Sequence, residues 1–209
     1  MSKNAIIIPF RGLKKDKSRL RRDFSNETVE RLLYSMVKRT LKVVMKLDYE
    51  KEIFLLTKNK NVKFDADYNL LLDEGEDLNE ALEKALRKIK ADNYVILMAD
   101  LPLINKENIE YILSYISEKK EVVLVKSQDN GTSVIAFPNK FSFISPLVFG
   151  ANSSKRFIEI FEKNKIPFKL IEKAAWGMDL DTRKDLKEII KNNNVPLFLQ
   201  LIKNDDLNE

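Results

Sequence analysis

The chain alternates short apolar runs with longer stretches whose apolar residues recur at helical spacing. Its most apolar run is residues 94–104 (YVILMADLPLI), in which positions 95–99 carry no polar side chain. A strand that is apolar on both faces is typical of the centre of a parallel sheet covered by helices. Pro102 cannot donate a ladder hydrogen bond, so we expect the strand to end at Asp100.

The same two patterns assign the rest of the chain. Apolar runs predict further strands at residues 4–10, 52–57, 68–72, 121–126, 132–137 and 168–172. Helical spacing predicts helices from Ser25 or Asn26 to about 47, over 78–91 and 105–117, from Asn152 or Ser153 to about 164, and after Thr182. This alternation predicts an α/β fold.

The turn signal Asp129-Asn-Gly131 predicts a hairpin between the strands at 121–126 and 132–137, so the sheet is expected to be mixed. Each of the five glycines falls between predicted elements. No linker divides the sequence, which predicts a single domain over residues 1–209. From about 194, Pro196 starts a short apolar helix followed by an acidic tail.

The amino-acid composition excludes several kinds of catalytic and metal site. The 209 residues include no Cys and no His. Disulfides, thiolate nucleophiles, Cys/His zinc sites and imidazole acid–base catalysis are therefore excluded. A bound metal would have oxygen ligands, which favours magnesium. The net charge of +5 suits an anionic partner. No run reaches the length of a membrane span or a secretory signal, so we expect a cytoplasmic protein.

Candidate site residues follow the predicted strands. Asp100 falls at the carboxyl end of the central strand, the edge where open α/β sheets bind ligands; a simple turn cap is the alternative. Residues 11–22, after the first strand, hold seven basic residues in twelve. They suit a di- or triphosphate, or form a solvated basic loop, but they are not a P-loop. Asn79, in the first turn of a helix near this edge, is placed to touch a base or ribose.

Later segments add two more candidates. Gly150 and Ser153 precede a helix, and this arrangement is either an anion cradle or an ordinary N-cap. Asp179 and Asp181 alternate on an extended segment, so both carboxylates are expected to face one side. Together with Asp100, they would suit a magnesium ion.

A basic loop, three carboxylates and a second anion site together suit nucleotidyl transfer. A substrate phosphate oxygen attacks the α-phosphorus of a nucleoside triphosphate, and pyrophosphate leaves. That oxygen is already ionised at pH 7, so no general base is needed, in agreement with the absence of His and Cys. Catalysis then consists of positioning and charge neutralisation.

Six short pieces in order resemble the 2-phospho-L-lactate guanylyltransferase family, whose members activate a three-carbon phospho-acid for the synthesis of coenzyme F-420. The pieces are Ile6-Ile-Ile-Pro-Phe-Arg11 with Lys17-Ser-Arg-Leu20, Leu78-Asn-Glu-Ala-Leu82, Ala99-Asp-Leu-Pro-Leu103, Asp129-Asn-Gly-Thr132, Phe149-Gly-Ala-Asn-Ser153, and Asp179-Leu-Asp-Thr182 with Asp185-Leu186. They span nearly the whole chain.

The resemblance implies a Rossmann-like nucleotidyltransferase fold (nucleotide-diphospho-sugar transferase-like), a three-layer α/β sandwich with a mixed, mostly parallel sheet. It implies that GTP is joined to 2-phospho-L-lactate, phosphoenolpyruvate or 3-phosphoglycerate, with magnesium as cofactor and pyrophosphate released. The implied residues are Lys17, Arg19 and Asp100 for catalysis, Arg11, Lys17, Arg19 and Asn79 for the nucleotide, Thr132, Gly150 and Ser153 for the phospho-acid, and Asp100, Asp179 and Asp181 for the metal.

The sequence departs from the family pattern at several positions. Gly131 stands alone where many relatives have a glycine pair, and Phe157 stands where a His is expected. Gly12 and the lysines after it replace a more apolar loop start. These differences leave the identity of the acceptor open.

Other functions remain open at this stage. A nucleotidyltransferase for a sugar phosphate or molybdopterin is an alternative, although such enzymes usually carry a glycine-rich loop after the first strand. A nucleic-acid-binding module lacks the interleaved aromatics that stack on bases, so no nucleic-acid partner is expected. A non-catalytic homologue is a third alternative. The apolar C-terminal segment is suited to a homodimer.

Overall fold

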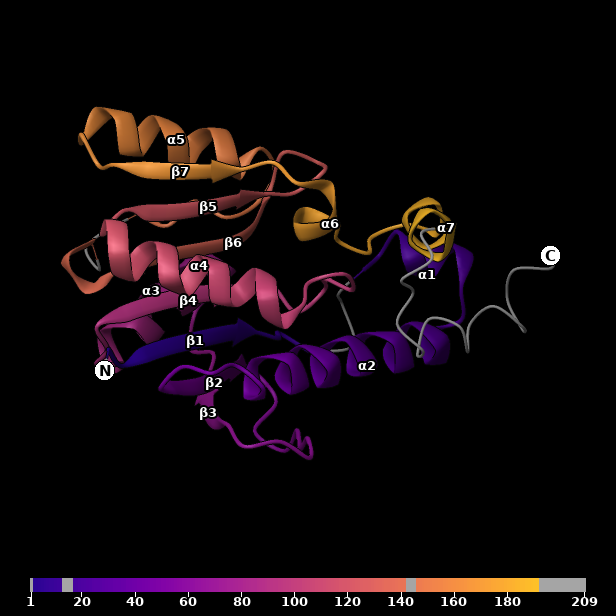
Figure 1. The fold of residues 1–209 in the computed structure, drawn as a ribbon. Coiled ribbons are helices and arrows are strands. Elements are labelled where there is room, and N and C mark those ends of the chain that lie inside the picture. The colour runs from indigo at the N-terminus through magenta and orange to yellow at the C-terminus, as the bar shows by residue number, and fades with distance from the viewer. Residues whose placement is uncertain (1, 13–16, 142–145, 192–209) are drawn as a thin grey trace.

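The computed structural model describes residues 2–12, 17–141 and 146–191, and it is built on one seven-stranded sheet (Figure 1). The strands are β1 (Asn4–Pro9), β2 (Lys51–Thr57), β3 (Asn69–Leu72), β4 (Asn93–Leu97), β5 (Val122–Lys126), β6 (Thr132–Pro138) and β7 (Phe168–Ile171). The helices are α1 (Leu20–Asp23), α2 (Asn26–Met45), α3 (Leu78–Lys88), α4 (Lys106–Lys119), α5 (Ser153–Lys163), α6 (Ala174–Gly177) and α7 (Arg183–Lys191), with a 3₁₀ turn η1 (Asn139–Phe141).

The sheet has the strand order β3-β2-β1-β4-β6-β5-β7. Neighbouring strands are parallel except at β6, which runs antiparallel to both β4 and β5. The mixed, mostly parallel sheet and the β5–β6 hairpin predicted from the sequence are therefore confirmed. The order reverses between β1 and β4, and in open α/β sheets ligands bind in the crevice at such a reversal.

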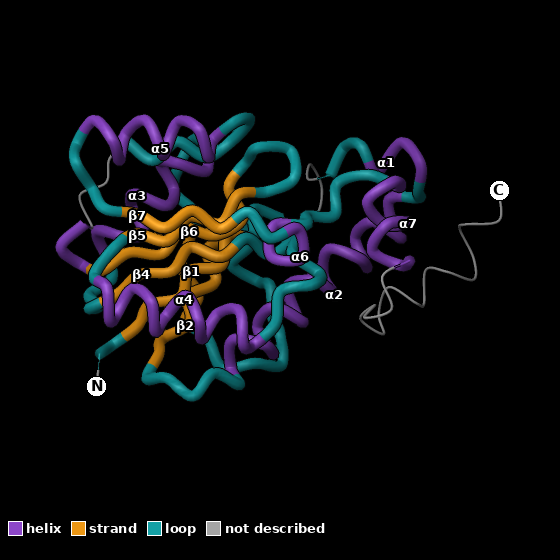
Figure 2. Tube along the Cα trace, turned by 45° about the horizontal axis from the view of Figure 1, so that its top comes forward, coloured by secondary structure: helices purple, strands orange, loops and turns teal. Residues whose placement is uncertain are grey.

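Two helical layers enclose the sheet, as Figure 2 shows. Apolar residues of α2 and α4, such as Leu41 and Ile112, pack on one face, and those of α3 and α5, such as Leu82 and Phe161, pack on the other. The central strands β1 and β4 are buried along their whole length, as their unbroken apolar runs predict. The result is a three-layer α/β sandwich.

A third, smaller apolar cluster lies beyond the sheet, where α1, α7 and the start of α2 meet (Figure 1). Leu20 of α1 and Leu186 of α7 are fully buried in it. Residues 17–19 directly precede α1, and residues 179–182 directly precede α7. The cluster therefore brings the N-terminal ends of two helices, separated by about 160 positions in the sequence, to one place.

Three predicted details were wrong. The central strand β4 ends at Leu97 rather than at Asp100, because the chain leaves the sheet after the Met98 amide donates to the Ser133 carbonyl. The basic segment is not all loop, since the buried side chain of Leu20 fixes α1 within it. Gly177 closes the short helix α6 instead of lying between elements.

Several predictions stay untested. The helix and tail expected from about 194 lie outside the described residues, and the single-domain organisation stays a prediction. Within the described ranges, no helix is both long and apolar enough to cross a membrane.

Candidate active site

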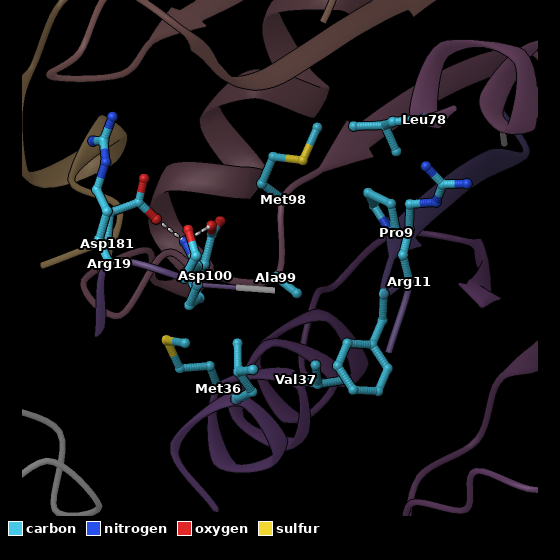
Figure 3. A pocket seen from close by; sticks show the side chains of 14 residues that line it. Pro9, Arg11, Arg19, Met36, Val37, Leu78, Met98, Ala99, Asp100 and Asp181 are labelled. Atoms are coloured by element: carbon cyan, nitrogen blue, oxygen red, sulfur yellow. Dashed lines mark hydrogen bonds and ion pairs between the residues drawn. The ribbon is translucent and has the colours of Figure 1, made fainter. Parts of the chain in front are cut away.

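A cavity of about 380 Å³ opens at the carboxyl ends of β1 and β4, at the point where the strand order reverses (Figure 3). One wall is apolar and comes from Leu33, Met36 and Val37 of α2. Figure 3 shows Arg11 at one end of the cavity and Arg19 and Asp181 at the other. The cavity therefore has an apolar wall, the Arg11 cation at one end and a group of opposite charges, called the charged end below, at the other.

Lys17 lies at the charged end, with its ammonium Nζ paired to both Asp100 and Asp181. Its side chain is only 11% exposed. Burial lowers the pKa of this ammonium, but the charges and hydrogen bonds of the two carboxylates outweigh it and hold the pKa well above its ordinary value. Lys17 is therefore a fixed cation that bridges two of the predicted metal ligands and offsets one of their two negative charges.

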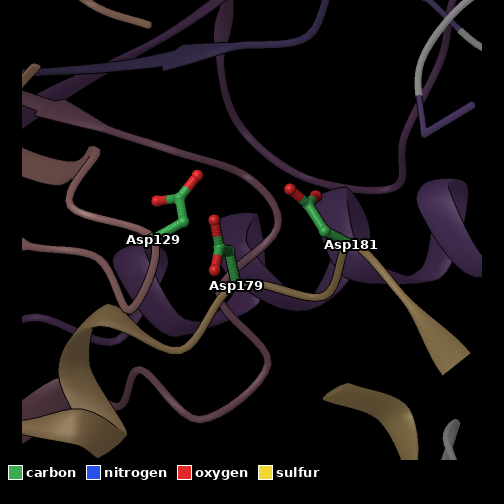
Figure 4. A group of neighbouring side chains, drawn as sticks. All are labelled: Asp129, Asp179 and Asp181. Carbon is green, nitrogen blue, oxygen red and sulfur yellow. The ribbon is translucent and has the colours of Figure 1, made fainter. Parts of the chain in front are cut away.

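A cluster of three carboxylates lies beside this lysine (Figure 4): Asp129, Asp179 and Asp181 each place an oxygen within 4.8 Å of the others. Burial, together with the charges of Asp100 and Asp181, raises the pKa of Asp179 to about 7. A carboxyl group whose ionisation is opposed in this way is typical of a functional site. Asp179 and Asp181 face the same region, as their alternate spacing predicts.

Backbone contacts hold the carboxylate segment in place. The Leu180 amide donates to the Asp100 carbonyl at 3.2 Å, and the Gln128 amide donates to the Gly177 carbonyl at 3.3 Å. A Cβ on Gly177 would lie 2.0 Å from the carbonyl oxygen of Lys126, so only glycine allows this approach. Gly177 thus lets the segment before Asp179 pack directly against the end of β5.

Asp129 belongs to the site, although the sequence did not predict it as a site residue. Its Oδ1 accepts a hydrogen bond from the Gly131 amide at 2.9 Å and a short one from the Ser127 hydroxyl. Burial opposes its ionisation, but these hydrogen bonds hold the pKa of Asp129 below its usual range. The signal in the sequence was the Asp-Asn-Gly turn, which predicts a hairpin and does not show that the carboxylate reaches a strand-end cluster.

The donor set fits a hard divalent cation. Carboxylate oxygens are the ligands that magnesium and manganese prefer, and Asp129, Asp179 and Asp181 offer three of them in one place. Asp100 belongs to the same charged region, since its charge acts on Asp179 and it shares Lys17 with Asp181.

The predicted phospho-acid residues meet at the turn after β5. The hydroxyl of Ser153 donates to the hydroxyl of Thr132 at 2.9 Å, and both side chains are buried. Gly150 has φ of +123°, a conformation that favours glycine. The first amides of α5 already have partners within the protein, because Ser153 donates to Gly150 and Ser154 donates to Asn130. None of the three residues lines the cavity and Ser153 is fully buried, so their contact with a phospho-acid stays a prediction.

Two of the residues predicted to bind the nucleotide already have hydrogen-bond partners within the protein. Arg11 donates from Nε to the buried carboxylate of Asp73 at 2.7 Å, although it also lines the cavity. Asn79 exchanges two hydrogen bonds with the backbone of Phe149, at 2.7 and 3.2 Å. Asn79 therefore ties α3 to the segment that leads into Gly150. Arg19 lines the cavity and is exposed at its charged end.

Phe157, in the place of an expected His, is fully buried and does not line the cavity. Its ring packs edge-on against Phe149 at 5.3 Å and stacks with Phe161 at 5.9 Å between centroids. A side chain in this position supports the segment before Gly150 from behind.

Comparison with known proteins adds the family. The family model described as "Guanylyl transferase CofC like" matches residues 4–196. The chain belongs to this guanylyltransferase family. The match covers the β1 end, the central aspartate and the late carboxylate segment, so the whole candidate site lies within it.

Curated relatives of this chain are named guanylyltransferases as well. A phosphoenolpyruvate guanylyltransferase of Thermobaculum terrenum is 26% identical over 191 residues, covering 88% of this chain and 82% of the relative. A 2-phospho-L-lactate guanylyltransferase of Methanocaldococcus jannaschii is 26% identical over 196 residues, covering 92% and 84%.

Solved structures show the same fold. A protein described as a nucleotide-diphospho-sugar transferase, from Desulfovibrio desulfuricans G20, superposes with a TM-score of 0.79 at 20% identity, covering 98% of this chain and 96% of the other. Rv0371c from Mycobacterium tuberculosis, solved with manganese, superposes with a TM-score of 0.56 at 14% identity, covering 92% and 100%. The Rossmann-like nucleotidyltransferase fold expected from the sequence is therefore confirmed.

Proposed function

We propose that this guanylyltransferase joins GTP to a three-carbon phospho-acid and releases pyrophosphate. The observation that carries the proposal is the carboxylate cluster with Lys17 at the β1–β4 reversal of a chain from this family. The relatives named above act on phosphoenolpyruvate and on 2-phospho-L-lactate, which supports an acceptor of this size and charge. A role in coenzyme F-420 synthesis and a cytoplasmic location are part of the same proposal.

The cavity is assigned to the nucleotide. Its apolar wall from α2 suits the nucleoside, while Lys17 and Arg19 at the charged end suit the phosphates. Arg11 keeps its ion pair with Asp73 and lines the nucleoside end, and Asn79 acts by positioning the Phe149–Gly150 segment. These cations hold the triphosphate in line with the acceptor and offset the charge that develops on the leaving pyrophosphate.

Magnesium is proposed as the cofactor, held by Asp100, Asp179 and Asp181 with Asp129 as an additional ligand. When bound, it neutralises phosphate charge and polarises the phosphoryl group. The protein keeps these four carboxylates close together, at the end of the cavity where the nucleotide phosphates are proposed to bind. Hydrogen bonds from Ser127 and Gly131 fix the direction of Asp129.

The acceptor is assigned to Thr132, Gly150 and Ser153. Thr132 follows Gly131, whose amide donates to Asp129 of the carboxylate cluster. A phospho-acid whose carboxylate or phosphate is held by these residues would therefore lie beside that cluster. The attacking phosphate oxygen carries a negative charge at neutral pH, so these residues need only orient it. A homodimer built through the C-terminal segment is proposed as well, and its test is the mass of the protein in solution.

Pyrophosphate release tests the reaction. The purified protein is assayed with magnesium while the four common nucleoside triphosphates are crossed with 2-phospholactate, phosphoenolpyruvate, 3-phosphoglycerate and a sugar phosphate. Release that requires GTP and one three-carbon phospho-acid is the expected result. Release with a sugar phosphate instead would keep the mechanism and replace the acceptor. A folded protein that releases no pyrophosphate with any pair would overturn the proposal.

Asp100→Asn tests the site. Turnover should fall by at least about 10²-fold, since charge stabilisation of this kind is worth about 3 kcal/mol or more. Asp48→Asn is the matched control, because Asp48 also pairs with a lysine, Lys106, but is exposed and lies elsewhere. Circular dichroism confirms that both variants fold. Parent-like turnover of Asp100→Asn would remove Asp100 from the site.

A further inference from the structure

Lys17 bonds the same carboxylates that the proposed function assigns to the divalent ion. Its ammonium is paired to Asp100 and Asp181, and Asp181 also belongs to the three-carboxylate cluster. We propose that Lys17 is an internal substitute cation, which holds the metal ligands together in the absence of substrate and yields them when the phosphates of a nucleotide draw its ammonium away. This inference rests on the proposed function of the site.

The charges of the site support this role. Asp129, Asp179 and Asp181 each place an oxygen within 4.8 Å of the others. Asp100 lies next to this group, because it shares the ammonium of Lys17 with Asp181. Like charges this close repel one another, so without a divalent ion the carboxylates need another cation to remain close together. Lys17 supplies one positive charge and shares Asp181 with the cluster. A divalent ion at the cluster and the ammonium of Lys17 therefore compete for the carboxylate of Asp181.

Lys17 has an unfavourable backbone conformation in the ion-paired state. Its φ is +59°, in the left-handed region, which is unfavourable for a residue other than glycine. The two ion pairs offset this strain only while they last. The Lys17 carbonyl accepts from the Arg21 amide at 3.1 Å, which ties it to α1, and Leu20 anchors that helix in the third cluster. Loss of the ion pairs thus lets Lys17 change conformation next to a fixed helix.

The consequence is coupled binding. A metal that binds alone must break the ion pairs of Lys17. A nucleotide that binds alone must draw Lys17 away from its two carboxylates. When both bind, the phosphates take the ammonium and the carboxylates take the metal, so the two cations no longer compete. Each ligand should therefore raise the affinity of the other, as linkage requires.

Manganese titration without nucleotide tests the inference. We expect Lys17→Gln to bind Mn²⁺ at least about tenfold more tightly than the parent, because one competing charge close to the metal is removed. Lys17→Arg keeps the charge and should bind Mn²⁺ like the parent. Lys106→Gln is the matched control, since Lys106 also joins two carboxylates, Asp48 and Glu110, on the surface. Equal or weaker Mn²⁺ binding by Lys17→Gln would overturn the inference.

Lysine labelling of the parent protein covers the case in which Lys17→Gln does not fold. Mn²⁺ at a saturating concentration should raise acetylation of Lys17 by an amine-reactive ester, measured by mass spectrometry, and leave Lys106 unchanged. An unchanged Lys17 in Mn²⁺-loaded protein would refute the exchange. Neither measurement uses turnover, so the two proposals can fail separately. Normal guanylyl transfer without the exchange would refute only this inference. The exchange without guanylyl transfer would refute only the proposed reaction.

Discussion

Asp179 is the carboxyl group whose ionisation the fold opposes, so removing its charge should stabilise the metal-free protein. The proposed change is Asp179→Asn, which keeps the size of the side chain. Burial and the charges of Asp100 and Asp181 raise the pKa of Asp179 from its ordinary 3.8 to about 7. The whole of this difference corresponds to about 4 kcal/mol. Partial exposure to solvent reduces it, and we expect a gain of about 1–2 kcal/mol in the free energy of unfolding at pH 8.

The pH dependence has a definite sign. Between pH 4 and pH 7 the folded parent keeps a proton on Asp179 that the unfolded chain has lost, so the stability contributed by this group falls as pH rises. Asn does not titrate. The advantage of Asp179→Asn should therefore be small near pH 4, grow up to about pH 7 and stay constant above it.

Urea denaturation with a chelator present measures this gain, and thermal unfolding should show a rise in Tm of about 2–8 °C for a chain of this size. Asp129→Asn is the control from the same cluster. Hydrogen bonds from Ser127 and Gly131 hold the pKa of Asp129 low, so this change should lower stability at neutral pH. A stability of Asp179→Asn at or below that of the parent at pH 8, or a gain independent of pH, would refute the reasoning.

Three other changes probe the supports of the site. Gly177→Ala places a Cβ 2.0 Å from the Lys126 carbonyl oxygen. It should lower the free energy of unfolding by about 2 kcal/mol or more and weaken Mn²⁺ binding. Parent-like values in urea denaturation and metal titration would contradict this prediction. Asn79→Ala removes both hydrogen bonds to the Phe149 backbone. We expect the free energy of unfolding to fall by about 1–3 kcal/mol and the KM for the acceptor to rise. An unchanged KM would show that Asn79 does not position that segment. Phe157→His buries a polar ring among phenylalanines and should cost about 1–3 kcal/mol in denaturant, whereas unchanged stability with a lower acceptor KM would place this residue at the substrate.

Local features of the sequence were enough to identify most elements. The apolar runs of β1 and β4 are long enough to be strands buried on both faces, and Asp129-Asn-Gly131 specifies a tight turn by its own conformational preferences. Ser25, one of the two predicted starts of α2, caps that helix, and Asp77 caps α3 just before the predicted start at 78. These features depend on contacts between residues near one another in the chain, which a sequence pattern records.

The boundaries of short elements did not follow in this way. The helix α1 is only four residues long and lies in a basic segment with no helical stripe of its own. It forms because Leu20 is buried against residues of α2 and α7, and such support comes from segments distant in sequence. The same holds for α6, which depends on the contact of Gly177 with the end of β5.

The sequence by itself determined which chemistry the chain can perform: without His or Cys it offers carboxylates, amines, guanidiniums and hydroxyls at the carboxyl ends of strands. Only the tertiary structure decided how those groups combine. It joined Asp129 to Asp179 and Asp181, gave Lys17 two carboxylate partners, and engaged Asn79 with the backbone. The physical reason is that charge and hydrogen-bond partners depend on distances of a few ångströms in space, and these are fixed by the packing of segments far apart along the chain.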